Sequence, residues 1–366
     1  MEKIGVIGIG KLGLCFALTM EKAGYKVLGA DVNQDYVDAI NHGKFHSDEV
    51  GVNERLAEST NFVATVRLAD IVNFSRFLYT VVATPSLPNG EYDHSQLDNV
   101  VEQLVAMGPV EEKKYFIVCC TTMPEHCDKI QEILAPLNYE VCYNPEFIAQ
   151  GTILRDQEFP DMVLIGESSQ EAGDLIQAHY EQMTTNTPKF CRMTCTEAEI
   201  CKISLNCFLT TKISFANMVG DICLKAGANP DAVLSAVGAD SRISHKYLGF
   251  GYGFGGPCFP RDNRALARYG ISKGIDALVS KASDDMNNAH AVYKYDDFVK
   301  NNPDKTVPVE FDYVTYKPES TMLVESQQLR LAVMLARAGY KVVVKERPVV
   351  VAALRERYGN LFTYEE

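Results

Sequence analysis

The sequence lacks paired cysteines, and it lacks long apolar runs. Its 366 residues include 11 cysteines, but none of them forms a Cys-x-x-Cys pair or a zinc-finger spacing. We therefore expect reduced thiols, no disulfides and no metal site. No apolar run approaches the length of a membrane span, and residues 1–5 lead into a strand pattern without a signal peptide. These absences predict a cytoplasmic protein.

Basic residues are scarce relative to acidic ones. Lys and Arg number 35 against 48 Asp and Glu, which gives a formal net charge of −13. This excess argues against nucleic acid or an anionic membrane as a partner, although backbone N–H groups and a few cationic side chains can still hold a phosphate-bearing ligand. The sequence has no internal repeat and no low-complexity tract, and its length predicts two or three domains.

Residues 4–31 show the pattern of a dinucleotide-binding βαβ unit. Its strand, glycine turn, helix and second strand are residues 4–9, Gly8-x-Gly10-x-x-Gly13, residues 14–23 and residues 26–30. The glycines allow a tight turn and a close approach of a pyrophosphate to the helix N-terminus. Asp31 follows the second strand and can accept hydrogen bonds from the adenosine ribose, and its charge favours NAD over NADP.

Three further strand patterns end in polar residues. Residues 77–82 lead to Thr84-Pro85, residues 115–119 lead to Thr121-Thr122, and residues 141–143 lead to Asn144-Pro145-Glu146. Parallel sheets bind ligands at the carboxyl ends of their strands, so the pattern predicts an N-terminal Rossmann-like, doubly wound α/β sheet with a site at that edge. Thr-Pro is also an ordinary way to leave a strand. On position alone, Glu146 is better explained as a helix cap than as an active-site acid.

Residues 196–227 predict one long helix that joins two lobes. Lys202 and Asn206 lie one turn apart on it and can address the same ligand, although a solvated polar stripe has the same spacing. After residue 301 strand and helix patterns alternate again, enough for about half of a doubly wound domain. We predict an NAD-binding domain, a central helical domain and a shortened C-terminal α/β domain over residues 1–195, 196–295 and 296–366.

Residues 249–262 set five glycines before Cys258. A backbone so rich in glycine can pass within contact distance of a ligand. Pro260 suits the first turn of a helix, so Cys258 would lie near free N–H groups that stabilise a thiolate. The alternative is a flexible surface loop with an incidental buried thiol, because most cysteines are small packing residues.

An ordered set of motifs now connects these segments. The set comprises Gly8-x-Gly10-x-x-Gly13, Thr84-Pro85-Ser86, Thr121-Thr122-x-Pro124, Asn144-Pro145-Glu146-Phe147, Glu199-x-x-Lys202-x-x-x-Asn206, Phe254-Gly255-Gly256-Pro257-Cys258-Phe259-Pro260-Arg261-Asp262, and Tyr316-Lys317-Pro318 with Glu325-Ser326. In these motifs, and over about residues 2–345, the chain resembles the nucleotide-sugar dehydrogenases, the family of UDP-glucose and GDP-mannose dehydrogenases.

The resemblance implies a four-electron oxidation of the C6 hydroxymethyl group of a nucleotide sugar to a carboxylate, with two NAD⁺ used in succession. The substrate that it favours is UDP-glucose. Cys258 is then the nucleophile that forms a thiohemiacetal and later a thioester. The family's other catalytic residues match Lys202, Asn206, Asp262, Glu146 and Thr122. The alternatives are a GDP-mannose dehydrogenase and a catalytically weak paralogue that only binds NAD and a nucleotide sugar.

The resemblance also implies two sets of binding residues. For NAD they are Gly8, Gly10, Lys11, Leu12, Gly13, Asp31, Thr84, Pro85, Thr121, Thr122, Gln150 and Arg261. For the nucleotide sugar, a UDP-hexose, they are Glu146, Phe147, Ile148, Lys202, Asn206, Arg242, Tyr247, Leu248, Gly255, Gly256 and Lys317. Arg242 would reach the site of a neighbouring subunit, which implies a homodimer built on the long helix.

The chain departs from the family at several positions. Gln150 stands where close relatives have a second glutamate, and Tyr36 and Val324 stand where many members have arginines. Because an amide cannot act as a base, this role falls to Glu146, with Asp262 and Thr122 assisting.

Overall fold

The structure is a computed structural model that describes residues 1–148, 151–318 and 320–365. These residues form two compact units, Met1–Lys202 and Ile203–Glu366. The boundary lies inside one long helix, α9 (Cys195–Lys225), and not before it. The division into three domains stays a prediction.

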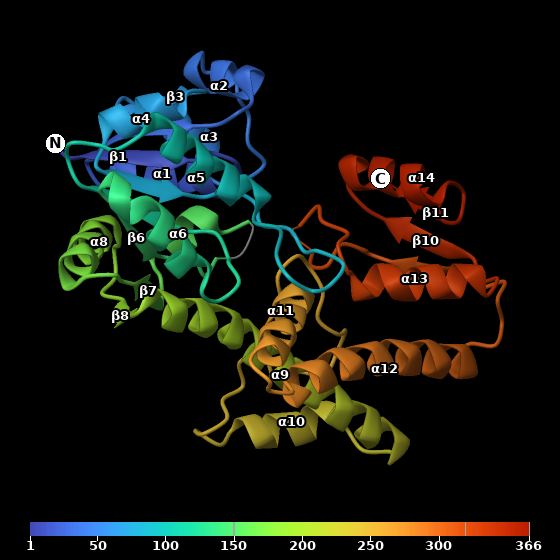
Figure 1. The fold of residues 1–366 in the computed structure, drawn as a ribbon. Helices are drawn as coiled ribbons and strands as arrows, with labels where there is room; N and C mark the ends of the chain where they lie inside the picture. The colour runs from blue at the N-terminus through green and yellow to red at the C-terminus, as the bar shows by residue number, and fades with distance from the viewer. Residues whose placement is uncertain (149–150, 319, 366) are drawn as a thin grey trace. The chain divides into compact units, whose positions relative to one another are not determined.

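The first unit is built on an eight-stranded sheet of order β3-β2-β1-β4-β5-β6-β7-β8 (Figure 1). Its strands are β1 (Lys3–Ile7), β2 (Lys26–Ala30), β3 (Phe62–Thr65), β4 (Phe77–Thr80), β5 (Lys114–Val118), β6 (Tyr139–Tyr143), β7 (Met162–Gly166) and β8 (Lys189–Met193). Neighbouring strands are parallel except β6 and β7. The predicted doubly wound sheet is confirmed, and its order reverses between β1 and β4, where such sheets bind ligands.

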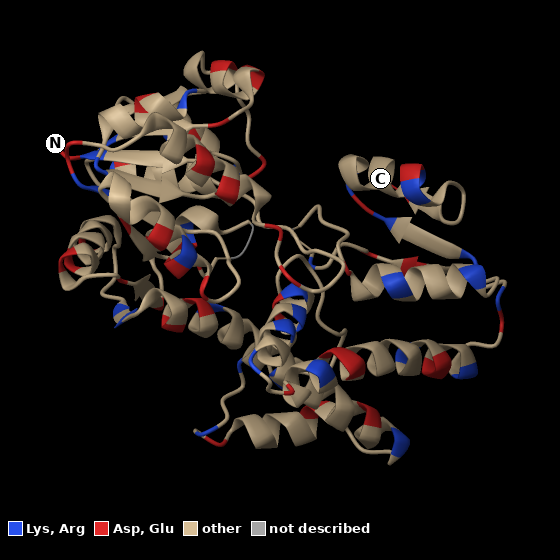
Figure 2. Ribbon diagram, viewed as in Figure 1, with Lys and Arg blue, Asp and Glu red and all other residues tan. Residues whose placement is uncertain are grey.

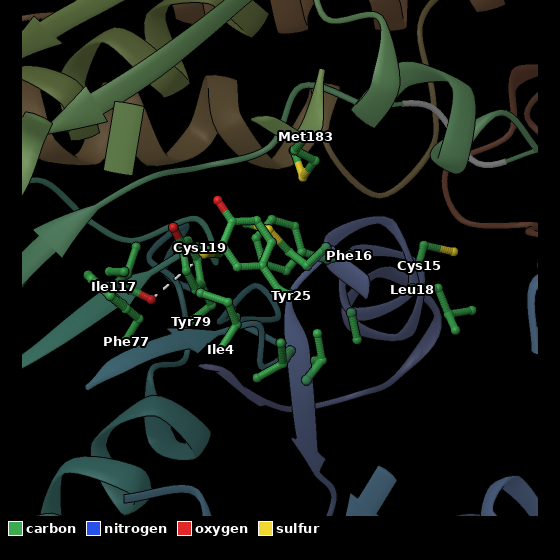
Figure 3. Close-up of a cluster of buried hydrophobic side chains, with 14 of the residues drawn as sticks. Ile4, Cys15, Phe16, Leu18, Tyr25, Phe77, Tyr79, Ile117, Cys119 and Met183 are labelled. Atoms are coloured by element: carbon green, nitrogen blue, oxygen red, sulfur yellow. Dashed lines mark hydrogen bonds between the residues drawn. The ribbon is translucent and has the colours of Figure 1, made fainter. Parts of the chain in front are cut away.

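Helices cover both faces of this sheet. They are α1 (Lys11–Lys22), α2 (Gln34–Asn41), α3 (Val52–Glu58), α4 (Leu68–Phe74), α5 (Ser95–Met107), α6 (His126–Leu134), η1 (Ala135–Leu137), α7 (Ile153–Glu158) and α8 (Gln170–Met183). One apolar core lies under α1 and α8, where Phe16 packs on Tyr79 with ring centroids 4.8 Å apart (Figure 3). A second lies under α4, α5 and α6. Because both faces are buried, β4, β5 and β6 are apolar along most of their length.

The second unit contains the rest of α9 and a helical lobe, followed by a small parallel sheet of order β11-β10-β9. Its elements are α10 (Pro230–Gly238), α11 (Phe259–Ser272), α12 (Leu278–Asn301), β9 (Val309–Phe311), α13 (Gln327–Arg337), β10 (Val342–Lys345), α14 (Pro348–Tyr358) and β11 (Thr363–Glu365). The small sheet has its own apolar core. The alternation of strand and helix expected after residue 301 is confirmed, and β11, a three-residue strand at the end of it, was not expected.

Helix α9 is long and apolar enough, by length and composition, to cross a membrane. Its most apolar 18-residue window has a mean hydropathy of 1.2, so the expectation that no run reaches that length is wrong here. Of that window 44% is buried inside the structure, and the core helix of a soluble protein passes the same test. Figure 2 shows acidic and basic residues interspersed on the helices, so the net charge of −13 is not gathered in one segment.

Candidate active site

The glycine turn after β1 is shaped by close contacts of the backbone. Gly8 has a φ of 85°, and a Cβ at Gly13 would lie 1.9 Å from the Gly8 carbonyl oxygen. Both positions therefore require glycine. Around Gly10 nothing lies within 4 Å of a Cβ, and α1 begins at the next residue, Lys11. This open space at a helix N-terminus fits a pyrophosphate.

Asp31 stands at the end of β2, as the sequence predicts, and its carboxylate accepts from the backbone N–H of Asn33 at 3.1 Å. Tyr36 donates its hydroxyl to the carbonyl oxygen of Ile9 at 2.7 Å and so supports the glycine turn. Burial and the nearby Asp31 carboxylate raise the pKa of Tyr36, so it stays a neutral donor. The residue in the place of the family's arginine therefore has a structural partner of its own.

One hydrogen bond joins the loops after β4 and β5, and another closes the loop after β4 on itself. Thr84 donates its hydroxyl to the carbonyl oxygen of Thr121 at 2.7 Å, and the Pro85 carbonyl accepts from the Asp93 N–H at 2.7 Å. The polar residues expected at the carboxyl edge of the sheet do lie together there, because β4 and β5 are adjacent and parallel.

Glu199 is a functional candidate that reasoning from the sequence did not select. Its buried carboxylate accepts from the Thr122 hydroxyl at 2.8 Å, from the Glu125 N–H at 2.7 Å and from the Cys127 N–H at 3.0 Å. Burial raises the pKa of Glu199 although these hydrogen bonds oppose it. Because the Thr122 proton goes to Glu199, the Thr122 oxygen is left to act as an acceptor. The only sequence signal was the shared Glu-x-x-Lys motif.

Glu146 lies in a polar cluster after β6 and does not cap a helix, since α7 begins only at Ile153, with Thr152 at its N-cap. The Tyr180 hydroxyl lies 3.2 Å from Glu146 Oε1, and Lys202 Nζ donates to the Glu146 carbonyl oxygen at 2.5 Å. Desolvation raises the pKa of the Glu146 carboxyl to about 7, against the opposing effects of Tyr180 and Lys202. A carboxyl that titrates near neutrality suits a general base.

Lys202 and Asn206 are each only 8% exposed, so they are not a solvated polar stripe. The Lys202 ammonium lies 4.1 Å from the centroid of the Phe147 ring, on whose face a cation is stabilised. In the second unit, Asn206 donates its side-chain amide to Asp262 Oδ2 at 2.6 Å. Helix α9 therefore carries Lys202, which contacts Glu146 and Phe147, and Asn206, which contacts Asp262.

Cys258 is the one exposed cysteine of the eleven; the others are buried or half-buried, and none of the eleven is in a disulfide. It occupies the N-cap of α11, with Pro260 in the first turn, so the expected place at a helix N-terminus is what the structure shows. A helix N-terminus favours a negative charge, and an exposed thiol there can react. The alternative of a buried packing cysteine is therefore wrong.

Asp262 follows in the first turn of α11 and is fully buried. Its two carboxylate oxygens accept from Asn206 and, at 3.2 Å, from Arg261 Nε, while its own N–H donates to the Cys258 carbonyl at 2.8 Å. Asp262 thereby links α9 to the helix that carries Cys258.

The glycine-rich stretch before Cys258 packs closely against residues 324–325. A Cβ at Gly255 would lie 2.4 Å from the Glu325 carbonyl oxygen, and Gly256, with a φ of 82°, donates its N–H to the Val324 carbonyl at 2.9 Å. The loop is therefore closely packed and not a flexible surface loop.

The remaining candidates are more scattered. The Arg242 side chain is 86% exposed and pairs with Asp240. Tyr247 is exposed with a φ of 62°, whereas Leu248 is buried. The Lys317 ammonium lies 5.8 Å from the centroid of the Tyr316 ring. Leu12 and Ile148 are half-buried against the core under α1, and Gln150 lies outside the described residues.

Two family models match the chain. The model of the NAD-binding domain of the UDP-glucose/GDP-mannose dehydrogenase family matches residues 2–184, and the model of its central domain matches residues 196–289. The chain belongs to this family. It is an NAD-dependent oxidoreductase of the nucleotide-sugar 6-dehydrogenase type, and the open glycine turn at Gly10 fits the cofactor.

Individual relatives support this assignment. The GDP-mannose 6-dehydrogenase and the UDP-glucose 6-dehydrogenase of Pseudomonas aeruginosa are 27% and 28% identical, over 96% and 97% of this chain and 82% and 81% of theirs. A solved UDP-glucose dehydrogenase from the archaeon Pyrobaculum islandicum is similar at a TM-score of 0.89 and 29% identity, covering 100% of this chain and 86% of that one. A GDP-mannose dehydrogenase structure from Pseudomonas aeruginosa has a TM-score of 0.61 at 25% identity, with coverages of 100% and 88%.

Proposed function

We propose that the chain oxidises UDP-glucose to UDP-glucuronate. The observation that carries the chemistry is the exposed Cys258 at the N-terminus of α11, one turn before the buried Asp262. The similarity to the UDP-glucose dehydrogenase structure, at a TM-score of 0.89 against 0.61 for the GDP-mannose enzyme, favours UDP-glucose as the substrate. GDP-mannose is the second candidate, because GDP-mannose 6-dehydrogenases match 96% of the chain.

Cys258 divides the four-electron oxidation into two two-electron steps joined by a covalent intermediate. When bound at the glycine turn, NAD⁺ would supply the oxidant for each of two successive two-electron steps at C6, with an exchange of cofactor between them. After the first oxidation the Cys258 thiolate adds to the C6 aldehyde, forming a carbon–sulfur bond and an alkoxide that takes up a proton. The second oxidation converts this thiohemiacetal to a thioester, and water cleaves the carbon–sulfur bond to give the carboxylate and the free thiolate. The covalent bond retains the aldehyde while the cofactor exchanges.

The two groups of polar residues then take different roles. Lys202 and Asn206 supply positive charge and a hydrogen bond where negative charge develops on the C6 oxygen. Asp262 fixes the Asn206 amide through its 2.6 Å hydrogen bond. Glu146, with its pKa of about 7, acts as the base that activates water for thioester hydrolysis. Thr122, whose proton goes to Glu199, accepts a hydrogen bond from that water.

For NAD, the turn around Gly8, Gly10 and Gly13 would hold the pyrophosphate, and Asp31 the adenosine ribose. Thr84 and Thr121, joined at the neighbouring strand ends, would bound the nicotinamide side of the site. The sugar nucleotide would meet Phe147, Lys202 and the glycine-rich loop. These assignments follow the family motifs.

A homodimer is part of the proposal. Three large apolar side chains on α9 are spaced seven residues apart and remain exposed: Phe208 at 66%, Phe215 at 45% and Ile222 at 60%. Residues seven apart lie on one face of a helix, so they form a continuous stripe. A second copy of the chain that covers this stripe would also bring an exposed Arg242 to a partner's site. We propose a cytoplasmic location, in keeping with a nucleotide-sugar substrate.

The test is a substrate comparison with purified protein. UDP-glucose and GDP-mannose are incubated separately with NAD⁺, and NADH is followed by absorbance while the acid product is quantified. We expect two NADH per UDP-glucuronate and little signal with GDP-mannose. NADH formation with GDP-mannose alone would replace the substrate assignment. Binding of NAD and UDP-glucose without any turnover would show a binding paralogue in place of an enzyme.

A further inference from the structure

Three buried side chains hold the backbone of the loop that leads to Cys258. Asn287 of α12 accepts from the Phe254 N–H at 2.8 Å and donates to the Phe254 carbonyl at 2.9 Å. Asn217 of α9 accepts from the Gly251 N–H at 3.0 Å. His290 of α12 lies 2.8 Å from the Gly251 carbonyl oxygen through Nε2. The loop is thus fixed by side chains of two helices, four to seven residues before the cysteine.

His290 has an acceptor on each side of its ring. Its Nδ1 lies 3.0 and 2.9 Å from the two carboxylate oxygens of Asp221, and its Nε2 faces the Gly251 carbonyl. A neutral imidazole has one N–H donor and one acceptor nitrogen, whereas an ionised carboxylate and a carbonyl oxygen can only accept. Nε2 therefore donates to the Gly251 carbonyl, while Nδ1 either donates to an ionised Asp221 or accepts from a protonated one.

We infer that His290 is a positioning residue for Cys258: its ring ties the Gly251 carbonyl of the loop to the Asp221 carboxyl group of α9. Its connection to catalysis rests on the proposed role of Cys258. The ring is almost fully buried between the two groups that it bridges. A buried side chain with its hydrogen bonds made defines one loop conformation, and loss of the His290 ring leaves the Gly251 carbonyl without this donor.

Other titratable groups surround this pair. They are Lys225 of α9, Tyr252 of the loop, and Tyr293, Lys294 and Asp297 of α12. Lys294 lies one turn after His290 on α12, and its ammonium lies over the rings of Phe250 and Tyr252 at 5.6 and 4.7 Å. Burial lowers the pKa of Lys294.

The protonation of His290 can be measured directly, without substrate. The protein is labelled with ¹⁵N in the histidine rings, and the His290→Gln variant assigns the resonance. We expect a proton on Nε2 of His290, because the Gly251 carbonyl can only accept. The Asp221→Asn variant replaces the acceptor by an amide that can donate to Nδ1, so we expect a neutral ring there, protonated only on Nε2. A His290 ring without a proton on Nε2 in the unaltered protein would overturn the inference.

Hydrogen exchange tests whether the hydrogen bond from His290 holds the loop. In His290→Leu, amide exchange across residues 249–258 should rise about tenfold, because the Gly251 carbonyl loses its donor. In Asp221→Asn the Gly251 hydrogen bond survives, so exchange should stay close to that of the unaltered protein. His46→Gln, at an exposed histidine of the first unit, is the matched control. Unchanged exchange in His290→Leu would also overturn the inference; if that variant does not fold, the comparison is made with His290→Gln.

Catalysis gives the third readout. His290→Leu should lower kcat by about ten- to a hundredfold with little change in the KM for NAD⁺, because the cysteine is misplaced and the glycine turn of the first unit is untouched. Asp221→Asn should retain most of kcat. If the protein turns over neither sugar nucleotide, the proposed function fails, while the ring protonation and the exchange of the loop still decide the role of His290. Equal kcat in His290→Leu and the unaltered enzyme would contradict it.

Discussion

The Tyr180 hydroxyl donates its single proton toward two acceptors, Asn144 Oδ1 at 2.7 Å and Glu146 Oε1 at 3.2 Å. The orientation of the Asn144 amide is fixed, since its Nδ2 donates to the Leu164 carbonyl at 2.9 Å, so Oδ1 has to face the tyrosine. Tyr180 is buried, and burial raises its own pKa well above the ordinary value, so it remains a donor. It therefore stabilises the ionised form of Glu146.

Replacing Tyr180 by phenylalanine should shift the pH profile of the enzyme. The hydrogen bond lowers the pKa of Glu146, which burial sets at about 7, so its removal raises that pKa. A base must be deprotonated to act, and the acidic limb of kcat should move to higher pH, by about one unit, while activity recovers at alkaline pH. The measurement is kcat from pH 5.5 to 9.5.

The matched control is Tyr139→Phe. Tyr139 is a buried tyrosine on β6 whose hydroxyl has no hydrogen-bond partner within the described part of the chain. Its removal should leave the acidic limb in place. A loss of kcat in Tyr180→Phe that is the same at every pH would mean that the tyrosine only supports the fold.

Glu146→Gln should change how stability depends on pH. The carboxyl has an ordinary pKa of 4.5 and a folded-state pKa of about 7, so the folded state binds the proton more tightly. Below pH 4.5 the group is neutral in both states and imposes no cost. As the pH rises from 4.5 to 7 the unfolded state ionises first, and the unaltered protein loses up to about 3 kcal/mol of unfolding free energy.

Glutamine does not ionise, so Glu146→Gln should gain stability relative to the unaltered protein across this window and hold that gain at pH 8. Urea unfolding at a series of pH values gives both curves. Curves that stay parallel from pH 4.5 to 8 would show that burial does not perturb Glu146.

The glycine turn after β1 was predictable because its determinants are local in the sequence. The spacing of Gly8, Gly10 and Gly13 indicates a turn whose geometry needs glycine. Asp31 follows this motif at the distance along the chain that a dinucleotide-binding unit requires. The order of the sheet then places the ends of β4 and β5 side by side, so strand patterns alone brought Thr84 and Thr121 together.

The supporting contacts were not predictable in this way. Tyr180 meets Glu146 across 34 residues, and His290 meets Asp221 across 69 residues, so each pair exists only after the helices pack. The same holds for burial: the spacing of Lys202 and Asn206 is compatible with a solvated stripe, and only the packing of α9 excludes it. The membrane-like composition of α9 was missed because polar residues interrupt its apolar run.

Cys258→Ser should stop the oxidation before the acid. Serine is a poorer nucleophile than a thiolate, and the tethered intermediate does not accumulate. We expect formation of UDP-glucuronate to fall by at least about a thousandfold, while NAD⁺ and UDP-glucose still bind. Mass spectrometry measures the UDP-glucuronate formed, and absorbance measures the NADH. Because the other ten cysteines are not exposed, Cys201→Ser serves as control and should keep two NADH per acid. Undiminished acid production in Cys258→Ser would remove the thiol from the mechanism.

Phe215→Glu should disrupt the proposed homodimer. Phe215 lies in the middle of the exposed stripe on α9, between Phe208 and Ile222, so a carboxylate there would be buried without a partner in any interface built on this stripe. The dimer Kd should rise by about thirtyfold or more, which is the effect of losing a central interface residue. Light scattering over a concentration series measures the mass. Phe159→Glu changes an equally exposed phenylalanine of the first unit and should leave the mass unchanged. A dimer of unaltered affinity in Phe215→Glu would show that the interface does not lie on this stripe of α9. The proposal that Arg242 reaches a partner's site would then lose its basis.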